Sequence, residues 1–219
     1  MKRFIELNHP IQDGMTPYPG LSSPKVKAIV DHAASRPRYQ NRSEFYLGRL
    51  EMDCNTGTYL DSPFHRYPDT QDIGNIPLEQ VAGLPGHVVS AEMSASRSVN
   101  PQLPEGDLRG RAILVKTSWD ERWATERYYE PGPFLAPEFV DRILQARPAL
   151  VGVDCWNVDD TQDPARPVHT RLLAAGILIV EHLCNLQSLP PDGFRFYAVP
   201  LRVVGAATMP VRAFAEHDV

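Results

Sequence analysis

Three apolar runs in the second half of the chain constrain its fold most strongly. Residues 111–119, 149–160 and 177–183 are rich in aliphatic and β-branched side chains, a composition typical of strands buried inside a sheet. Two helical patterns lie between these runs, an amphipathic one at residues 137–148 and a shorter one at residues 169–176. This alternation predicts an α/β fold.

The remaining patterns add more strand than helix. Further strands are expected in the first half of the chain and near its end, at residues 4–11, 26–30, 43–53, 87–93 and 196–215. A short helix is expected over residues 77–86. The 21 prolines are scattered along the chain, and proline favours turns and loops because it fixes φ and lacks an N–H donor. The sequence therefore predicts a loop-rich α/β protein.

Length and composition narrow the class of protein. A chain of 219 residues suits one domain, which we place at residues 1–219. No apolar run approaches the roughly 18 residues that a membrane helix needs, and no apolar stretch of secretory length follows the first basic residues. The three cysteines form no CxxC pair, which argues against both a disulfide framework and a thiolate zinc cluster. We therefore expect a cytoplasmic protein without a membrane partner.

The charge balance indicates which partners to expect. A formal charge of −5 provides no basic stripe for nucleic acid. The expected partner is a small-molecule substrate, or another copy of the chain.

Four side chains near the ends of the predicted strands can carry chemistry. Asp61 and His65 lie in the segment Asn55–His65, which reads as a loop, His169 precedes the second helical pattern, and Glu181 ends an apolar run. Carboxylates and imidazoles are ligands of divalent metal ions. A Glu buried at the end of a strand needs a partner, and a cation would serve as one. Each residue taken alone is a weak signal, because a capped turn or an ion pair is the more common explanation.

Several segments taken together resemble one protein family. The segment NTGTYLDSPFH is similar to the H-x-G-T-H-x-D-x-P-x-H signature of the cyclase family, which includes kynurenine formamidases and isatin hydrolases. The segments LNHPIQDGMTPYPG, LVKTSW, GVDCWNVD and PVHTRLLAAGILIVEHLCNLQSLP resemble further family segments in the same order. This resemblance runs nearly from end to end. It implies the swivelling β/β/α fold, with a mixed β-sheet flanked by helices, and assembly into homodimers or larger homo-oligomers.

The resemblance also assigns roles to individual residues. It implies metal ligation by Asp61, His169 and Glu181, proton transfer by His65, and substrate contact by Tyr18. The chain departs from the family at the two histidines that open the signature, which are replaced by Asn55 and Tyr59.

These two replacements weaken the expected metal centre. An amide oxygen is a weak neutral ligand, and a phenol must lose a proton of pKa about 10 to bind a metal well. We therefore expect one divalent ion, zinc or manganese, bound by three protein ligands with an open position for water. Two alternatives stay open: an active site with altered chemistry, and a metal-free cluster in a protein that binds a small molecule without hydrolysing it.

The main hypothesis is a metal-dependent hydrolase that acts on the carbonyl of an amide, lactam or ester, such as an aryl formamide or a cyclic substrate. The ion would activate water and polarise the carbonyl, while His65 would pass the proton to the leaving group. Tyr18, Phe64 and Trp119 are candidates for an aromatic wall. Cys54 has no evident basic partner and is expected to be a small buried side chain.

Overall fold

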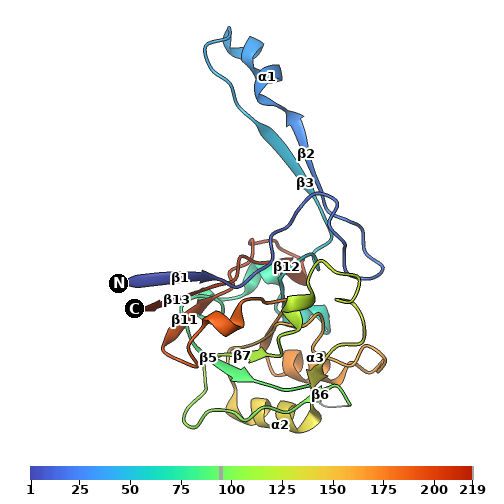
Figure 1. The fold of residues 1–219 in the computed structure, drawn as a ribbon, viewed down its shortest axis with the longest axis vertical. Helices are drawn as coiled ribbons and strands as arrows, with labels where there is room; N and C mark the ends of the chain where they lie inside the picture. Colours follow the sequence, from blue (N-terminus) through green and yellow to red (C-terminus); the bar gives the residue numbers. More distant parts are fainter. Residues whose placement is uncertain (94–95, 219) are drawn as a thin grey trace.

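The computed structural model describes residues 1–93 and 96–218, and its main feature is one curled mixed sheet (Figure 1). In the described residues this sheet has nine strands in the order β1-β13-β11-β5-β7-β9-β10-β4-β12. Their bounds are β1 Lys2–Glu6, β4 Tyr59–Asp61, β5 Leu84–Ser90, β7 Ala112–Lys116, β9 Leu150–Val153, β10 Leu178–Glu181, β11 Phe194–Tyr197, β12 Thr208–Pro210 and β13 Phe214–Asp218. The predicted α/β class with a mixed sheet is confirmed.

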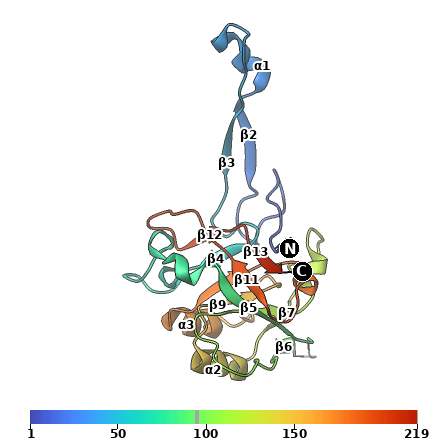
Figure 2. The same cartoon turned by 90° about the vertical axis from the view of Figure 1, so that its left-hand side faces the viewer.

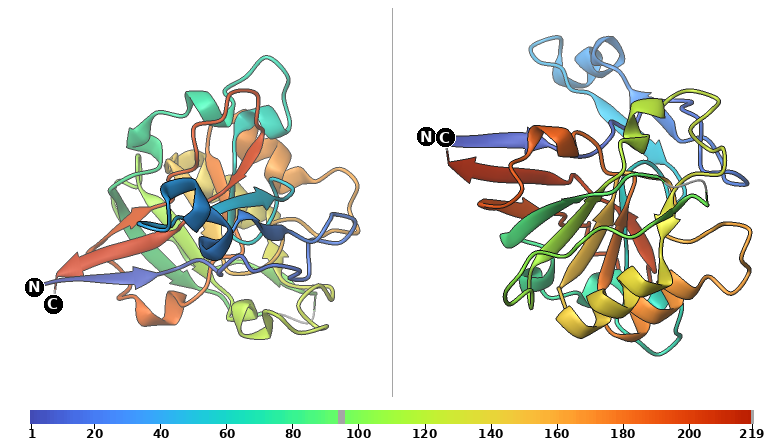
Figure 3. Two further views of the ribbon diagram at one scale, coloured as in Figure 1. Left: turned by 90° about the horizontal axis from the view of Figure 1, so that it is seen from above. Right: turned by 60° about the horizontal axis from the view of Figure 1, so that its bottom comes forward.

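The centre of the sheet is parallel and both of its edges are antiparallel. Strands β5, β7, β9 and β10 run parallel to their neighbours in that order. Strand β4 pairs antiparallel with β10, and β12 pairs antiparallel with β4. At the other edge β1 pairs antiparallel with β13, so that the two chain ends lie side by side (Figure 3).

The central strands are buried on both faces. On one face the helices α2 (Pro137–Ala146) and α3 (Pro167–Ala174) pack against alternate strand residues such as Ile113 and Val151. The intervening residues, such as Leu114, face a second core that also contains side chains from both edges of the sheet, because the sheet curls over it. Burial on both faces explains why these strands read as continuous apolar runs in the sequence.

A hairpin arm, which we define as residues 25–51, projects from this body. It consists of β2 (Lys25–Val30), β3 (Leu47–Glu51), the short helix α1 (His32–Ser35) and a 3-10 turn. Figures 1 and 2 show the arm extending from the end of the molecule opposite α2. Its exposed apolar side chains are Val26, Ile29, Tyr39, Tyr46, Leu47 and Leu50.

Two expectations from the sequence are wrong. Residues 77–86 do not form a helix: a 3-10 turn at Leu78–Gln80 leads directly into β5, which starts at Leu84. Pro85 has no N–H for a helical hydrogen bond, and Gly83 has φ +68°, so a helix cannot continue through these residues. Asn55–His65 is not only a loop, because Tyr59–Asp61 is a strand inside the sheet.

The remaining strands are short or lie apart from the main sheet. Strands β6 (Ser98–Val99) and β8 (Phe134–Leu135) form a separate parallel pair. Short 3-10 turns follow several strands, at Pro63–His65, Ile73–Asn75, Trp119–Arg122 and Leu186–Ser188. Within the described part of the chain, no helix combines the length and the apolar character needed to cross a membrane.

Candidate metal centre

The side chains of Asp61, His169 and Glu181 meet at one point although they come from three elements. Asp61 ends β4, His169 lies in α3 and Glu181 ends β10. One ligand atom from each residue lies within 4.8 Å of the corresponding atoms of the other two, and all three side chains are buried. The structure therefore brings together the three residues that the sequence suggested as metal ligands.

The register between β4 and β10 explains this convergence. Tyr59 lies opposite Glu181, and Asp61 lies opposite Ile179. Alternate residues of a strand point to opposite faces, so Tyr59, Asp61 and Glu181 share the face that α3 covers. Leu60 and Val180 point to the core on the other face. A slip of β4 by one residue would turn Asp61 to the other face, away from Glu181 and His169.

A carboxylate behind His169 sets the orientation of its ring. Nδ1 of His169 lies 2.6 Å from Oδ2 of Asp159, which places the Nδ1 proton in that contact and points Nε2 toward the other two acids. Asp159 also accepts the backbone N–H of Val168 at 2.7 Å and that of His169 at 3.2 Å. One carboxylate thus caps the start of α3 and fixes the imidazole, as second carboxylates commonly do for histidine ligands of metals.

Asp61 is the residue whose environment most needs a cation. Both of its carboxylate oxygens are buried and lack a hydrogen-bond partner among the described residues. The nearest positive group is His169, whose Nε2 lies 3.4 Å from Oδ2 of Asp61. Burial opposes charge on the His169 ring, but Glu181, Asp159 and Asp61 together raise its pKa to about 10. A buried carboxylate without donors is costly, so this donor set fits a bound metal ion.

Glu181 is better satisfied than Asp61. Its Oε2 accepts the Tyr59 hydroxyl at 2.5 Å, and its Oε1 accepts the backbone N–H of Val158 at 2.7 Å. Burial raises the pKa of Glu181 to about 7, while the charge of His169 opposes this shift. Burial and the charges of Glu181 and Asp61 raise the pKa of Tyr59 well above 10, so its phenol keeps its proton and acts as a donor.

The other substituted position, Asn55, also faces this region. Its Oδ1 accepts the hydroxyl of Thr208 at 3.0 Å, and Asn55 lines the same cavity as the three candidate ligands. The cavity has a volume of about 370 Å³. Its lining is formed by Tyr18, Leu21, Asn55, Tyr59, Asp61, His65, Arg66, Asn157, Arg166, His169 and Glu181.

His65 lies beside the cluster and its ring is uncharged near neutral pH. The centroids of the His65 and His169 rings are 5.8 Å apart. Burial lowers the pKa of His65, although the charge of Asp61 partly offsets this effect. A neutral imidazole in this place can accept a proton.

The aromatic wall is only partly as predicted. Tyr18 lines the cavity, and its ring contacts those of Trp156 and Tyr129 with centroids 5.5 Å and 6.1 Å apart. Trp119 does not line the cavity; its ring is buried in the helix-side core and its Nε1–H donates to the carbonyl of Tyr128. Phe64 is also absent from the lining, although His65 beside it is present.

Cys54 differs from its prediction in the same region. It was expected to be buried, but it is exposed, because it lies in the turn that follows β3 rather than in a strand.

Four polar residues of the site were not singled out in the sequence. They are Arg66, Asn157, Asp159 and Arg166. Asp159 ends the segment GVDCWNVD and precedes His169 by ten residues. An acid placed shortly before a helix that carries a candidate ligand is a signal that could have identified it.

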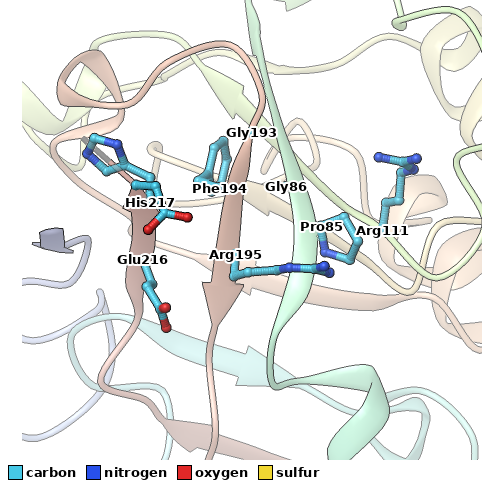
Figure 4. Close-up of a pocket in the computed structure, with 9 residues that line it drawn as sticks. Pro85, Gly86, Arg111, Gly193, Phe194, Arg195, Glu216 and His217 are labelled. Atoms are coloured by element: carbon cyan, nitrogen blue, oxygen red, sulfur yellow. The ribbon is translucent and has the colours of Figure 1, made fainter. Parts of the chain in front are cut away.

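A second hollow lies on the sheet and does not include Asp61, His169 or Glu181. It has a volume of about 270 Å³ and is formed over β5, β11 and β13 (Figure 4). Several of its charged groups have partners, since Glu216 pairs with Lys2 and accepts from Tyr197, and Arg111 donates to the carbonyl of Asp107. We find no comparable convergence of metal-binding groups there among the described residues.

Comparison with known sequences identifies relatives over most of the chain. The sequence model of the Cyclase family matches residues 5–160. A kynurenine formamidase of Salinibacter ruber is 32% identical over 183 residues, which cover 80% of this chain and 82% of that protein. A kynurenine formamidase of Bacillus cytotoxicus is 26% identical over 211 residues, covering 96% of this chain and 95% of that protein.

Solved structures agree in fold. An isatin hydrolase A from Labrenzia aggregata, bound to benzyl benzoate, superposes with a TM-score of 0.80 at 20% identity and covers 99% of this chain and 94% of its own. A protein from Bacillus stearothermophilus described as a predicted metal-dependent hydrolase superposes with a TM-score of 0.71 at 22% identity, and each chain is covered completely. At these identities the structures establish the shared fold alone. The match to the family model and the 32% identical relative show that this chain belongs to the cyclase family.

Proposed function

We propose that this protein is a metal-dependent hydrolase that cleaves the C–N bond of amides, with aryl formamides and lactams as the main substrate types. Esters, in which the C–O bond next to the carbonyl would be cleaved, are a further substrate type. The observation that carries this proposal is the pair of buried, unpartnered oxygens of Asp61 beside His169 and Glu181. The kynurenine formamidases among its relatives and the isatin hydrolase with a similar fold support hydrolysis of an amide or a lactam.

The proposed ion is a single zinc or manganese bound by Asp61, His169 and Glu181. Mixed oxygen and nitrogen donors suit both metals, and three protein ligands leave a position for water. Tyr59 limits the site to one ion, because its phenol stays protonated and occupies one oxygen of Glu181 with a hydrogen bond. When bound, the ion supplies Lewis-acid activation of the carbonyl and lowers the pKa of bound water to about 7.

The side chains around the ion have separate roles in orienting a ligand, transferring the proton and contacting the substrate. Asp159 holds the His169 ring with Nε2 directed toward the two carboxylates. His65 is neutral near pH 7, so it can accept a proton from the attacking water and deliver it to the leaving nitrogen. Tyr18 provides an aromatic surface for the substrate, held by the amide of Asn157, which donates to the Tyr18 hydroxyl at 3.3 Å. One water is consumed, so an amide yields a carboxylic acid and an amine, and an ester yields a carboxylic acid and an alcohol.

A metal-free binding protein is the competing hypothesis. In that protein His169, protonated, would be the permanent counter-ion of both Asp61 and Glu181, and Glu181 would also accept hydrogen bonds from Tyr59 and Val158. The position of Asp61 argues against this, because even a protonated His169 leaves both oxygens without a donor in hydrogen-bond contact.

The deciding experiment measures metal ions per chain by elemental analysis of protein purified without chelators. We expect a value near one, which the Glu181→Ala variant should reduce to near zero, together with the loss of formamide hydrolysis. Glu105→Ala, an exposed acid outside the cavity, serves as the matched control. A value near zero in the parent protein that does not rise after incubation with zinc or manganese would contradict the proposal and leave the metal-free hypothesis.

We further propose that the hairpin arm packs against a second copy of the chain. A two-stranded hairpin that projects alone is only marginally stable, and this one exposes Leu50 at 53% and Leu47 at 49%. Light scattering after size exclusion should show a dimer or larger assembly that Leu50→Glu weakens. Leu78→Glu, at a 63% exposed position on the body, should leave the mass unchanged. A monomeric parent protein would contradict this proposal.

We propose that the protein is located in the cytoplasm. Cys54, Cys155 and Cys184 are all free thiols, and unpaired cysteines are typical of a reducing compartment. Labelling of the exposed Cys54 in intact cells would test this proposal.

A further inference from the structure

Two arginines in the cavity wall have no hydrogen-bond or ion-pair partner among the described residues. Arg66 and Arg166 line the same cavity as Asp61, His169 and Glu181. Nε of Arg66 and Nη1 of Arg166 are buried and have no hydrogen-bond acceptor, and neither guanidinium forms an ion pair with any residue in the described ranges. A guanidinium carries five N–H donors, so donors withdrawn from water without an acceptor are unfavourable.

Among the described residues, the other partly buried arginines have an acceptor, whereas other arginines that lack one, such as Arg42 and Arg147, are exposed. Arg97 binds both oxygens of Asp160 at 3.0 Å, and Arg171 and Arg212 pair with Asp141 and Glu6. Acidic residues also outnumber basic ones in the chain, 27 against 22, so partners are not scarce. Arg66 and Arg166 are partly buried, lack an acceptor among the described residues, and line the cavity of the candidate metal centre.

The two arginines come from different parts of the chain. Arg66 directly follows His65 in the turn after β4. Arg166 comes three residues before His169 and has φ +48°, a left-handed conformation that is unusual for a residue other than glycine. This backbone conformation sits at the point where the chain enters α3. The two guanidinium groups therefore come from separate elements, and each element also carries a residue of the candidate site.

The charge of the cavity favours an anion once a metal ion is present. Asp61, Asp159 and Glu181 contribute up to three negative charges, and the two arginines contribute two positive charges. A divalent ion changes this balance to a net positive charge. A positive cavity attracts anionic ligands, and paired guanidinium groups match the geometry of a carboxylate.

We propose that Arg66 and Arg166 form an anion subsite that binds a carboxylate group of the substrate. The preferred substrate is then an amide that carries a free carboxylate in addition to the bond that is cleaved. This inference rests on the proposed hydrolase function and specifies its substrate class. The metal ligands and His65 act on the reacting carbonyl, while the arginines act as specificity-determining residues at the other end of the substrate.

The first test compares acidic and neutral aryl formamides. The probes are 2- and 4-formamidobenzoate and the uncharged formanilide, which differ in the carboxylate and share the scissile bond. From the strength of charge-assisted hydrogen bonds we expect kcat/KM for at least one acidic probe to exceed that for formanilide by about ten- to a hundredfold. Equal values for all three probes would overturn the inference.

Variants of the two arginines then test whether these residues cause the preference for acidic probes. Arg66→Gln and Arg166→Gln should each remove most of the preference through a higher KM for the acidic probe, while kcat/KM for formanilide changes by less than about twofold. Arg66→Lys and Arg166→Lys keep the charge and should restore part of the preference. Arg109→Gln, an exposed arginine paired with Asp107 outside the cavity, is the control. Equal losses for acidic and neutral probes would mean a structural role and overturn the inference.

A binding measurement separates this inference from the proposed hydrolysis. Calorimetric titration with 2- and 4-aminobenzoate, the amine products of the acidic probes, can be done on metal-loaded and on chelator-treated protein without any turnover. We expect saturable binding that weakens with added salt and is lost in the Arg66→Gln/Arg166→Gln double variant. Binding without hydrolysis would contradict only the proposed function. Hydrolysis of formanilide together with absent aminobenzoate binding would overturn only the anion subsite.

Discussion

Two buried histidines close to each other in the chain, His169 and His182, have opposite surroundings. His169 is close to three carboxylates, which outweigh its burial and raise its pKa to about 10. His182 directly follows Glu181, but its ring lies among aromatic rings, and burial lowers its pKa to about 3. The comparison teaches that surroundings, not residue type, decide whether a buried histidine can serve a cation site or fills a core.

The aromatic–histidine cluster, which we define as His9, Trp123, Tyr128, Tyr129 and His182, has no acidic member. The rings of His9 and Trp123 stack with centroids 3.8 Å apart, and Nδ1 of His182 lies 2.9 Å from the Tyr128 hydroxyl. Nε2 of each histidine is buried without a partner among the described residues. Glu181 bonds to Tyr59 and Val158 whereas His182 contacts Tyr128, so adjacent residues have different partners, although the Tyr59 ring lies 5.2 Å from that of His182.

The largest expected effect is a pH dependence of the free energy of unfolding. It arises from the histidines of the aromatic–histidine cluster and would sharpen their contrast with His169. Burial lowers the pKa of His9 to about 4 from its ordinary 6.5. Because the folded-state pKa is the lower one, the unfolded chain binds the proton first and stability falls as pH drops below about 6.5. We expect a loss of about 3 kcal/mol from His9 between roughly pH 7.5 and pH 4.

Urea unfolding at several pH values measures this loss. The His9→Asn variant provides the comparison, because it lacks the titrating ring while all other titrating groups stay the same. Identical pH slopes in the parent protein and the variant would show that His9 is not held neutral by burial.

The second prediction concerns Asp159, the acid that contacts Nδ1 of His169. Its removal would take away part of what distinguishes His169 from His182. Asp159→Asn keeps an oxygen that can cap α3 but replaces the acceptor of the Nδ1 proton, so His169 loses its orientation. We expect metal affinity to fall about ten- to a hundredfold, the usual effect of losing such a partner. Competition with a chromogenic chelator measures the affinity. Asp160→Asn, at the neighbouring acid that pairs with Arg97, is the control, and equal losses in both variants would refute the assigned role.

The smallest effect concerns the single hydrogen bond of His182. Tyr128→Phe removes the buried contact to Nδ1, and we expect the free energy of unfolding to fall by about 1 kcal/mol with metal content unchanged. Tyr129→Phe is the control, because the Tyr129 hydroxyl makes no hydrogen bond within the described residues. A change in metal content in Tyr128→Phe would show that the two environments are coupled rather than separate.

Much of the fold could be predicted from the sequence. The apolar runs at residues 111–119, 149–160 and 177–183 contain β7, β9 and β10, because strands buried on both faces must be apolar throughout. The helical pattern at residues 137–148 became α2. The helix expected at residues 77–86 is wrong because the local pattern could not reveal that Leu84 starts a strand that pairs with a neighbour on each side.

The sequence predicted the main residues of the candidate site but not the contacts between them. Asp61, His169 and Glu181 came from a family resemblance, and the structure brings them together. Strand β4 was read as a loop because it has only three residues, too few for a visible alternation. Partners such as Asp159, and the absence of partners for Arg66 and Arg166, depend on contacts between distant segments that a local pattern cannot contain. Their roles in catalysis, and the one-domain assignment, stay predictions.

The pairing of β4 with β10 has a consequence for how the protein folds. The hydrogen bond from Tyr59 to Glu181 joins residues 122 positions apart, and the three parallel strand pairs between β5 and β10 must also form across long crossovers. Closing such large loops costs chain entropy before the contacts compensate, which slows folding. The two carboxylates cannot face each other in any intermediate that lacks this pairing. Metal added to a refolding chain should therefore leave the rate of folding unchanged and slow only the reverse reaction, unfolding.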